Sequence, residues 1–157
     1  MLTPAQLENL KAAAQDAVAC EKLTELPAEL TVAQWALESG WGAHQPGNNC
    51  FGIKAYPGCF GIQSLETIEI VGNVRVKSAK AFASFPSLKA CFQKHAALIC
   101  EGMSYNVLWA RYLQSRDVTA LVKDVAAVYA TDPAYAQKLL AVTRMSAVEG
   151  AIAAARA

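Results

Sequence analysis

The sequence predicts an α+β domain that is mostly helical and carries one small β-hairpin lobe. Residues that start and end helices recur along most of the chain, whereas a single segment, roughly residues 66 to 83, has the alternating β-branched pattern of strands. The length of 157 residues and the hydrophobic content of 54% are enough for one hydrophobic core. No linker-like stretch divides the chain, so we expect a single domain over residues 1–157.

The first residues carry a helix-start signal. Thr3 can act as the N-cap, Pro4 takes the first helical position, and Gln6 stands three residues after the cap, as in a capping box. We expect this first helix to end near Cys20.

A second helix is predicted to begin near Pro27 or Thr31 and to stop at Gly40. Glycine suits that position because it readily adopts the left-handed backbone conformation that commonly ends a helix. The following segment, residues 40–61, contains six glycines and two prolines, which predicts an irregular loop.

The strand signal comes next in the chain. Residues 67–71 and 74–77 are rich in β-branched side chains that alternate with polar ones, and Gly72-Asn73 between them suits a two-residue turn. The pattern therefore predicts one antiparallel hairpin. A cleft between this hairpin and the helices is the expected place for an extended polymer.

After Pro86 the pattern is helical again. Four further helices are expected from their caps and periodicity. They cover about 86–101 (ending at Gly102), about 105–114, a segment capped by Asp117 that runs to about Ala130, and a last helix capped by Asp132-Pro133.

Charge and hydropathy exclude several classes of protein. The formal net charge is +1 and no stretch concentrates Lys or Arg, which argues against a nucleic-acid binder. Every apolar run is interrupted well before the 18 or so positions of a membrane span. The N-terminus lacks the basic start and apolar stretch of a secretory leader, so we expect export by another route or earlier removal of a leader. We also expect a monomer.

The five cysteines form an odd set, so at least one should be unpaired within the chain. Cys50 and Cys59 bracket a short Gly/Pro-rich loop and are candidates for a bridge in an oxidising compartment. Cys91 and Cys100 fit a helix as small apolar core residues. His44 with Cys50 and Cys59 matches no standard zinc spacing and lacks a fourth ligand, so no metal site is predicted.

Glu38 is the first candidate for chemistry. Residues 31–39 are apolar nearly all round the helix, which predicts a buried helix, and Glu38 is their only charged member, in the last turn. The helix dipole and burial both disfavour an anion there and favour the neutral carboxylic acid that a general acid requires. The alternative is a surface glutamate at the end of a helix.

Aromatic residues surround this position. Trp35, Trp41 and Phe51 could offer flat faces to sugar rings, or they could belong to the core, as aromatic residues near a helix often do. Trp41, between two glycines in a loop, is the one most expected to be exposed.

Hydrolysis of a glycosidic bond usually needs a second carboxylate across the bond. On the predicted hairpin, Glu69 alternates with Ile68 and Ile70, so its side chain should point to the face opposite theirs. Glu66 lies at the start of the strand. The alternative for either residue is a charged side chain that is simply solvated.

Four blocks, taken together, resemble the bacterial glucosaminidase family, of the flagellar muramidase and autolysin type. They span roughly residues 30 to 145, in the order and with the spacing of that family. The blocks are Ala33–Gly42 (AQWALESGWG), Asn49–Ala55 (NCFGIKA), Val76–Phe82 (VKSAKAF) with Phe85, and Tyr129–Ala136 (YATDPAYA).

The resemblance implies a lysozyme-like endo-β-N-acetylglucosaminidase that cleaves the glycan strand of peptidoglycan without a metal or an organic cofactor. It places the general acid at Glu38, the second acidic group at Glu69, and a tyrosine that orients or stabilises the reacting sugar at Tyr129, with Tyr135 as a second candidate. The residues expected to bind substrate are Trp41, Asn49, Phe51, Lys54 and Tyr135.

Two alternatives stay open at this point. One is another cut in the same polymer, by a muramidase or a lytic transglycosylase. The other is a non-catalytic domain that binds wall glycan, although binding alone does not need a buried acid. In each case we expect the protein to act on the cell wall, in the periplasm or outside the cell.

Overall fold

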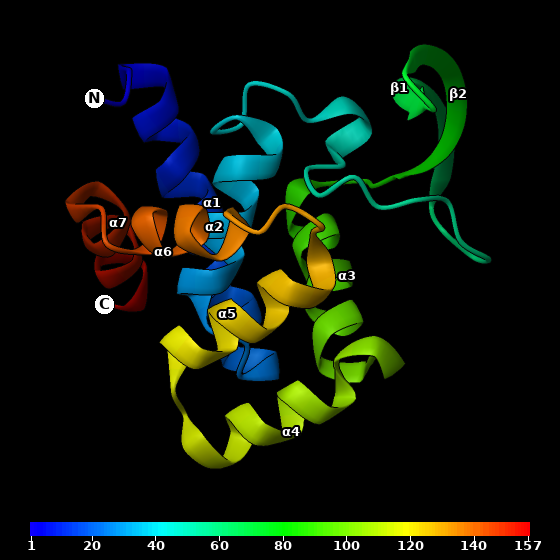
Figure 1. Cartoon of the computed structure of the whole chain (residues 1–157). Helices are drawn as coiled ribbons and strands as arrows, with labels where there is room; N and C mark the ends of the chain where they lie inside the picture. The colour runs from blue at the N-terminus through cyan, green and yellow to red at the C-terminus, as the bar shows by residue number, and fades with distance from the viewer.

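The structure, a computed structural model, describes all residues 1–157. Seven helices surround a small core and one hairpin projects from them (Figure 1). In chain order the elements are α1 (Pro4–Thr24), α2 (Ala28–Ser39), the 3₁₀ turn η1 (Pro46–Asn48), β1 (Gly61–Val71), β2 (Val74–Ser84), α3 (Leu88–Glu101), the 3₁₀ turn η2 (Met103–Tyr105), α4 (Asn106–Ser115), α5 (Val118–Tyr129), α6 (Tyr135–Thr143) and α7 (Ser146–Arg156).

The second helix, α2, lies at the centre of the molecule. It packs against α1, α5, α6 and α7, and nine of its twelve residues are buried. A helix that is apolar nearly all round has no face for solvent, so the other helices enclose it. Its predicted end is confirmed, because Gly40 follows at a φ of 58°.

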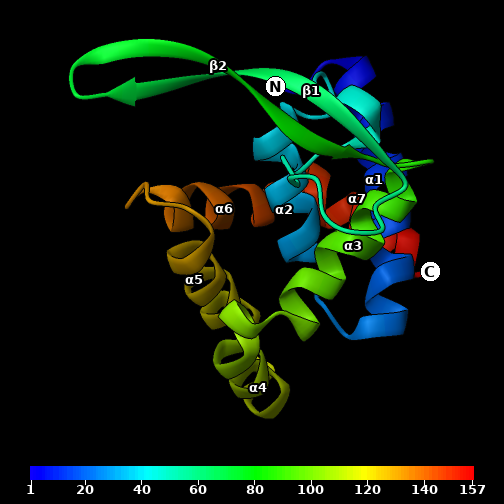
Figure 2. The ribbon, with the colours of Figure 1, turned by 90° about the vertical axis from the view of Figure 1, so that its right-hand side faces the viewer.

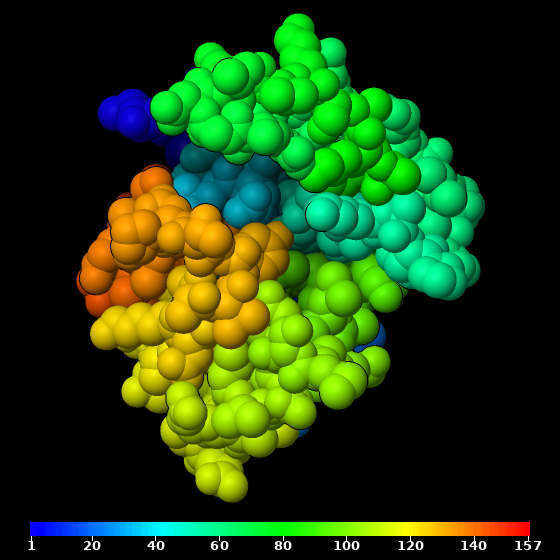
Figure 3. All heavy atoms as spheres, turned by 45° about the vertical axis from the view of Figure 1, so that its right-hand side comes forward, coloured from blue at the N-terminus to red at the C-terminus, as the bar shows by residue number.

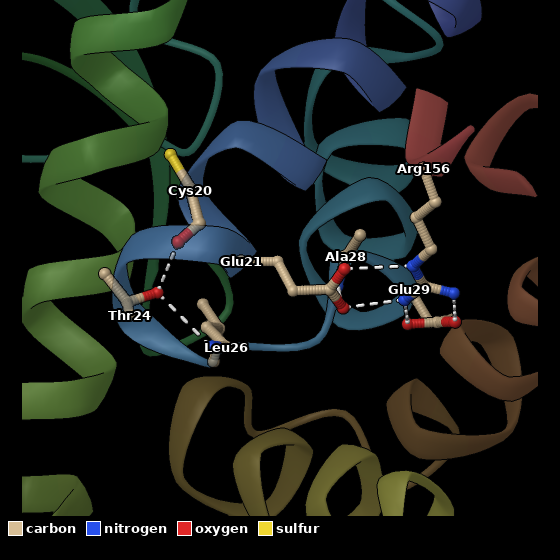
Figure 4. Close-up of polar contacts among 7 residues, drawn as sticks. All are labelled: Cys20, Glu21, Thr24, Leu26, Ala28, Glu29 and Arg156. Carbon is tan, nitrogen blue, oxygen red and sulfur yellow. Dashed lines mark hydrogen bonds and ion pairs between the residues drawn. The ribbon is translucent and has the colours of Figure 1, made fainter. Parts of the chain in front are cut away.

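The capping box at the start of α1 is confirmed. The Gln6 amide donates to Thr3 Oγ1 at 3.2 Å, and the Thr3 amide donates to Gln6 Oε1 at 2.9 Å. The helix runs past Cys20 to Thr24, since no breaker occurs before Pro27. At its end the Thr24 hydroxyl donates to the Cys20 carbonyl at 2.8 Å (Figure 4).

The hairpin is confirmed, with its turn at Gly72-Asn73, but it is longer than predicted, spanning Gly61–Ser84. Its base contacts η1 through β2, and its tip projects beyond the helices (Figure 2). Glu69 does face away from Ile68 and Ile70. The half-buried face is the one with Glu69, whereas both isoleucines are exposed, because the projecting tip has no second layer against its outer face.

Helices α3, α4 and α5 follow the prediction, and the Asp117 cap of α5 is confirmed by a 3.0 Å hydrogen bond from the Ala120 amide to Asp117 Oδ1. The prediction of a single last helix was wrong. The chain forms two helices, α6 and α7, with a break at Arg144-Met145. Nor does Asp132 cap α6: it accepts from the Ala134 amide at 2.9 Å in a turn that precedes the helix.

The candidate bridge between Cys50 and Cys59 is not formed in the structure, in which all five cysteines are free thiols. The neighbour of Cys50 is Cys91 of α3, with the two sulfur atoms 3.6 Å apart in the core. Cys59 lies in the more exposed loop before β1. No three His, Cys, Asp or Glu side chains are grouped as a metal site would need, and no helix combines the length and apolar character of a membrane span.

Arg156, near the end of α7, joins α1, α2 and α7 (Figure 4). Its guanidinium donates to Glu21 at 2.9 and 2.6 Å and to Glu29 at 2.8 and 2.9 Å. Glu21 also accepts from the Ala28 amide at 3.0 Å, which satisfies an N–H group at the start of α2. Burial raises the pKa of Glu21, but the hydrogen bonds from Arg156 and Ala28 outweigh burial and lower it overall.

Replacing Arg156 with Gln is expected to lower the free energy of unfolding by about 1–2 kcal/mol, because two partly buried carboxylates lose their shared partner. Urea unfolding at pH 7 measures this loss. Since the pKa of Glu21 is lowered by folding, its contribution is present above the unfolded value of about 4.3 and fades as the pH falls below it. The difference between wild type and variant should therefore shrink below about pH 4.

Lys11→Gln is the matched control, because the Lys11–Glu8 pair is exposed, with side-chain exposures of 64% and 72%. Its loss should stay below about 0.5 kcal/mol. An Arg156→Gln variant that loses no more than this control would contradict a structural role for the Arg156 network.

Candidate active site

A groove separates the hairpin from the α5–α6 segment, with α2 at its floor. Figure 3 shows this hollow between the green atoms of the hairpin and the gold and orange atoms of α5 and α6. Two cavities adjoin Glu38, which lines both: one of about 710 Å³ is bounded by the loop 51–56, α3 and α5, and one of about 370 Å³ by the loop 44–52 and the hairpin. Glu38 therefore lies where the two halves of the groove meet.

Glu38 is the penultimate residue of α2, as predicted, but its expected burial is wrong: the side chain is exposed. The core side of the last turn is taken by Trp35 and Ser39, whose hydroxyl donates to the Trp35 carbonyl at 2.6 Å. Glu38 points instead into the groove. The residues around the Glu38 carboxylate are therefore those that line the groove and not those of the core.

Tyr135, the first residue of α6, holds the Glu38 carboxylate. Its hydroxyl donates to Glu38 Oε1 at 2.8 Å, and its ring is buried. Burial raises the pKa of Tyr135, and the hydrogen bond to Glu38 raises it further. Tyr135 therefore stays a neutral phenol and a hydrogen-bond donor throughout the physiological pH range.

Tyr129, the last residue of α5, stacks on Tyr135 with ring centroids 5.9 Å apart and planes 9° from parallel. Its hydroxyl donates to the Phe51 carbonyl at 3.0 Å, so it does not bind Glu38 in this structure. Burial, together with the nearby charge of Glu38, raises the pKa of Tyr129. Of the two tyrosines named from the sequence, Tyr135 is the one that donates to Glu38.

The loop that contains Asn49 and Phe51 forms part of the groove wall. Asn49 Nδ2 donates to the carbonyls of Ile53 and Ala83, both at 2.8 Å, and its Oδ1 accepts from the Ile53 amide at 3.1 Å. These bonds occupy the polar atoms of Asn49, which therefore ties the loop to β2. Phe51 is buried and stacks on His95 at 4.0 Å, whereas Lys54 is exposed at the edge of the larger cavity.

Trp41 lies outside both cavities. Its ring packs edge-on against Trp35, with centroids 6.2 Å apart, and the Asn9 side chain donates to its carbonyl at 3.0 Å. Its backbone is in the left-handed region, at a φ of 60°. In this structure Trp41 supports the end of α2 and is only partly exposed.

Two hairpin carboxylates lie near the groove. Leu65 and Thr67, on the same face as Glu69, line the smaller cavity, but Glu69 itself lies farther along the strand, in an ion pair with Lys80. The hydrogen bond from Lys80 lowers the pKa of Glu69, so it stays ionised. Glu66 contributes to the lining of the smaller cavity, although its side chain belongs to the exposed face of β1.

Two polar residues behind the groove were not singled out from the sequence. Gln34 of α2 and His95 of α3 are both buried and lie 2.8 Å apart, from Gln34 Oε1 to His95 Nε2. The signal that could have revealed Gln34 is its position among the apolar residues Val32, Ala33, Trp35 and Ala36 of α2. His95 carries no such signal, because a lone histidine in an amphipathic helix is common.

Comparison with known proteins identifies relatives of this chain. Residues 14–146 match the glucosaminidase family, described as mannosyl-glycoprotein endo-beta-N-acetylglucosaminidase. The chain is 34% identical over 122 residues to the peptidoglycan hydrolase FlgJ of Vibrio parahaemolyticus, covering 72% of this chain and 38% of that protein. The chain thus spans less than half the length of this curated relative.

Solved structures share the fold. A crystal structure of a peptidoglycan hydrolase mutant from Sphingomonas sp. A1 superposes with a TM-score of 0.75 at 29% identity, covering 94% of this chain and 99% of that one. The catalytic domain of the autolysin Auto from Listeria monocytogenes has a TM-score of 0.79 at 24% identity, covering 95% and 89%. The second match shows the likeness of the fold alone.

Asn49→Asp is expected to destabilise the protein by about 2–4 kcal/mol, because an isosteric carboxylate faces two backbone carbonyls to which the amide donates. Thermal and urea unfolding measure the loss. Asn73→Asp, in the exposed hairpin turn, makes the same chemical change and should cost less than about 0.5 kcal/mol. If the two variants lost equal stability, Asn49 would not be the tie that holds this loop.

Proposed function

The chain belongs to the glucosaminidase family and has its lysozyme-like fold, and from this premise we propose that it is a peptidoglycan hydrolase that cleaves the glycan strand as an endo-β-N-acetylglucosaminidase. The observation that carries the proposal is the position of Glu38. It lies where two cavities meet and is held by a neutral tyrosine. A groove that continues on both sides of the acid suits a cut within a polymer.

Glu38 is proposed as the general acid that protonates the glycosidic oxygen. In the free protein the side chain is exposed, so the protein alone does not exclude water from it. A glycan strand that fills both cavities would remove that water and favour the neutral acid. Tyr135 would keep the carboxyl group in place, and Tyr129 would support Tyr135 from behind.

Glu69 is proposed as the second carboxylate, acting directly or through water. It is ionised, it shares its face of the hairpin with the residues that line the smaller cavity, and its ion pair with Lys80 keeps it at the hairpin surface. Glu66 is the rival, because it borders the cavity next to Glu38. The hairpin wall therefore offers one carboxylate on each of its faces.

Substrate contacts are proposed mainly along the larger cavity. Lys54 presents a cation at its edge, and Gly52 and Tyr129 contribute to its wall. Phe51 and Asn49 act by shaping the wall, since one is buried and the polar atoms of the other are occupied. A protein with this substrate would act in the cell envelope, in the periplasm or outside the cell.

Two alternatives to this function differ from it in their products: one releases other products, and the other releases none. A muramidase or a lytic transglycosylase would cut the same strand at the neighbouring bond, and a transglycosylase needs only one acid. A non-catalytic domain would bind wall glycan and release nothing. The hydrogen bond from Tyr135 to Glu38 favours a catalytic function over a binding function, because binding a neutral glycan needs no oriented carboxyl group.

Glu38→Gln is expected to keep the fold and lose activity on purified peptidoglycan by about a hundredfold to ten-thousandfold, because the amide cannot donate the acid proton. Glu101→Gln, at the exposed end of α3, is the control and should match wild type. Release of soluble fragments measures the rate. Wild-type turnover in Glu38→Gln would overturn the assignment of the acid.

Mass spectrometry of the wild-type digest identifies the bond. A reducing-end N-acetylglucosamine is expected. A reducing-end N-acetylmuramic acid would make the protein a muramidase, and an anhydro-sugar would make it a transglycosylase. Tight binding to wall glycan without release of any fragment would show that the protein is a non-catalytic binding domain.

Glu69→Gln and Glu66→Gln form a matched pair for the second carboxylate. If Glu69 supports attack on the anomeric carbon, Glu69→Gln should lower kcat by about a hundredfold, while Glu66→Gln changes it by less than about threefold. The same fragment assay measures both variants. The reverse order would assign the role to Glu66, and two small effects would show that neither carboxylate takes part.

A further inference from the structure

The two cavities that adjoin Glu38 differ in their chemistry. The smaller one is lined by several polar side chains, among them His44, Glu66 and Thr67, and only three of its ten residues are hydrophobic. In the larger one, nine of the fourteen residues are hydrophobic. A sugar ring carries hydroxyl groups around its edge and suits the smaller cavity. The larger cavity suits a ligand that also carries apolar groups.

Large apolar side chains are exposed inside the larger cavity. Leu98 of α3 and Val128 of α5 line it with exposures of 40% and 47%, and Ile53 of the loop before β1 also contributes to its wall. Covering apolar surface with an apolar ligand group is favourable, because it removes that surface from water. The ligand of this cavity should therefore carry small apolar groups.

A cation without an acidic partner lies in the same cavity. Lys94 Nζ of α3 is 3.9 Å from the centroid of the Tyr56 ring, and both residues line the larger cavity. The ring attracts the ammonium group and holds it in place, but it carries no net charge to neutralise it. Lys94 is half-buried and takes part in no ion pair of the chain. Its charge is left for an anion of the ligand.

Lys54 adds a second cation at the edge of this cavity. It too takes part in no ion pair, although, after Lys80, it contributes to lowering the pKa of Glu69 on the hairpin. Glu38 is the only carboxylate among the lining residues, so the cavity has two lysines and one acid. This balance favours an anionic ligand, and Lys94 is the lysine best placed to bind it.

We propose that the larger cavity binds the peptide stem that branches from the glycan strand of peptidoglycan, with Lys94 paired to a carboxylate of the stem. This inference rests on the proposed function, which makes peptidoglycan the substrate, and it adds which part of the polymer this cavity recognises. Lys94 is then a residue that determines specificity and not a catalytic one.

The peptide stem has both properties that the cavity requires. It carries the methyl groups of alanine, which suit Leu98 and Val128, and free carboxylates, which suit Lys94. Stems branch from alternate sugars, so every bond between the two kinds of sugar lies next to a stem. The sizes also agree, since a peptide of several residues needs more room than a sugar ring and the larger cavity has about 710 Å³ against about 370 Å³.

Binding of soluble peptidoglycan strands to the Glu38→Gln variant tests the proposal without cleavage of the strands. Strands with stems are expected to bind at least about tenfold more tightly than the same strands after an amidase has removed the stems. The stripped strands keep their sugar rings and a lactyl carboxylate, so the difference reports on the stem. Isothermal titration calorimetry measures both Kd values. Equal values, or no measurable binding of either strand, would overturn the proposal.

Replacement of Lys94 in the same background tests the charge. Lys94→Gln should weaken binding of the stem-bearing strands about tenfold and change binding of the stripped strands by less than about twofold, because only the stem carboxylate loses its partner. Lys94→Arg keeps the cation and its contact with the Tyr56 ring, so its Kd should stay within about threefold. Equal Kd values for the two variants would contradict the pairing.

Lys89→Gln is the matched control. Lys89 belongs to the same helix, is exposed, and lines neither cavity, so its loss should leave both Kd values unchanged. Thermal unfolding checks that each variant is folded. Strands whose stem carboxylates have been converted to carboxamides keep the methyl groups, and they should lose the same factor as Lys94→Gln. If they bound as tightly as the untreated strands, Lys94 would not pair with a carboxylate.

The outcome is separate from that of the proposed function. If the wild-type protein releases fragments but the stems do not affect Kd, the hydrolase stands and the stem site falls. If it releases no fragment while Kd depends on the stems and on Lys94, the stem site stands and the catalytic function falls.

Discussion

The enclosure of α2 is the constraint on which the rest of the structure depends. Because nine of the twelve residues of this helix are buried, the other helices must surround it, and Glu38 in its last turn reaches the surface. Gly40 then ends the helix in a left-handed conformation. Glu38 is thereby held at the floor of the groove on a rigid element, as its proposed role as the general acid requires.

Hydrogen bonds, and not burial, control the surroundings of Glu38 in the free protein. Tyr135 begins α6 and Tyr129 ends α5, so the short connection between these two helices brings both rings to one side of the carboxyl group. Both phenols are kept neutral by burial. In the proposed function, the exclusion of water from Glu38 is left to the substrate.

The hairpin supplies the opposite wall with little support from the core. Its base is tied by Asn49, which donates to the Ala83 carbonyl, while its tip projects freely with exposed isoleucines on its outer face. The ion pair of Glu69 and Lys80 lies on the groove-side face, where a carboxylate and an ammonium group can remain partly solvated. A wall of this kind combines a fixed base with an open end.

The sequence by itself determined the local structure: the capping box of α1, the end of α2 at Gly40, the hairpin turn and the Asp117 cap. These features depend on residues a few positions apart. Its motifs also indicated the family. Only the tertiary structure decided that Glu38 is exposed, that Cys50 contacts Cys91, and that Tyr135 is the tyrosine that donates to Glu38. These contacts join residues that are far apart in the chain. The separation is 97 positions for Tyr135 and Glu38, 61 for His95 and Gln34, and 41 for Cys50 and Cys91. No local pattern encodes which distant side chains the packing of helices brings together.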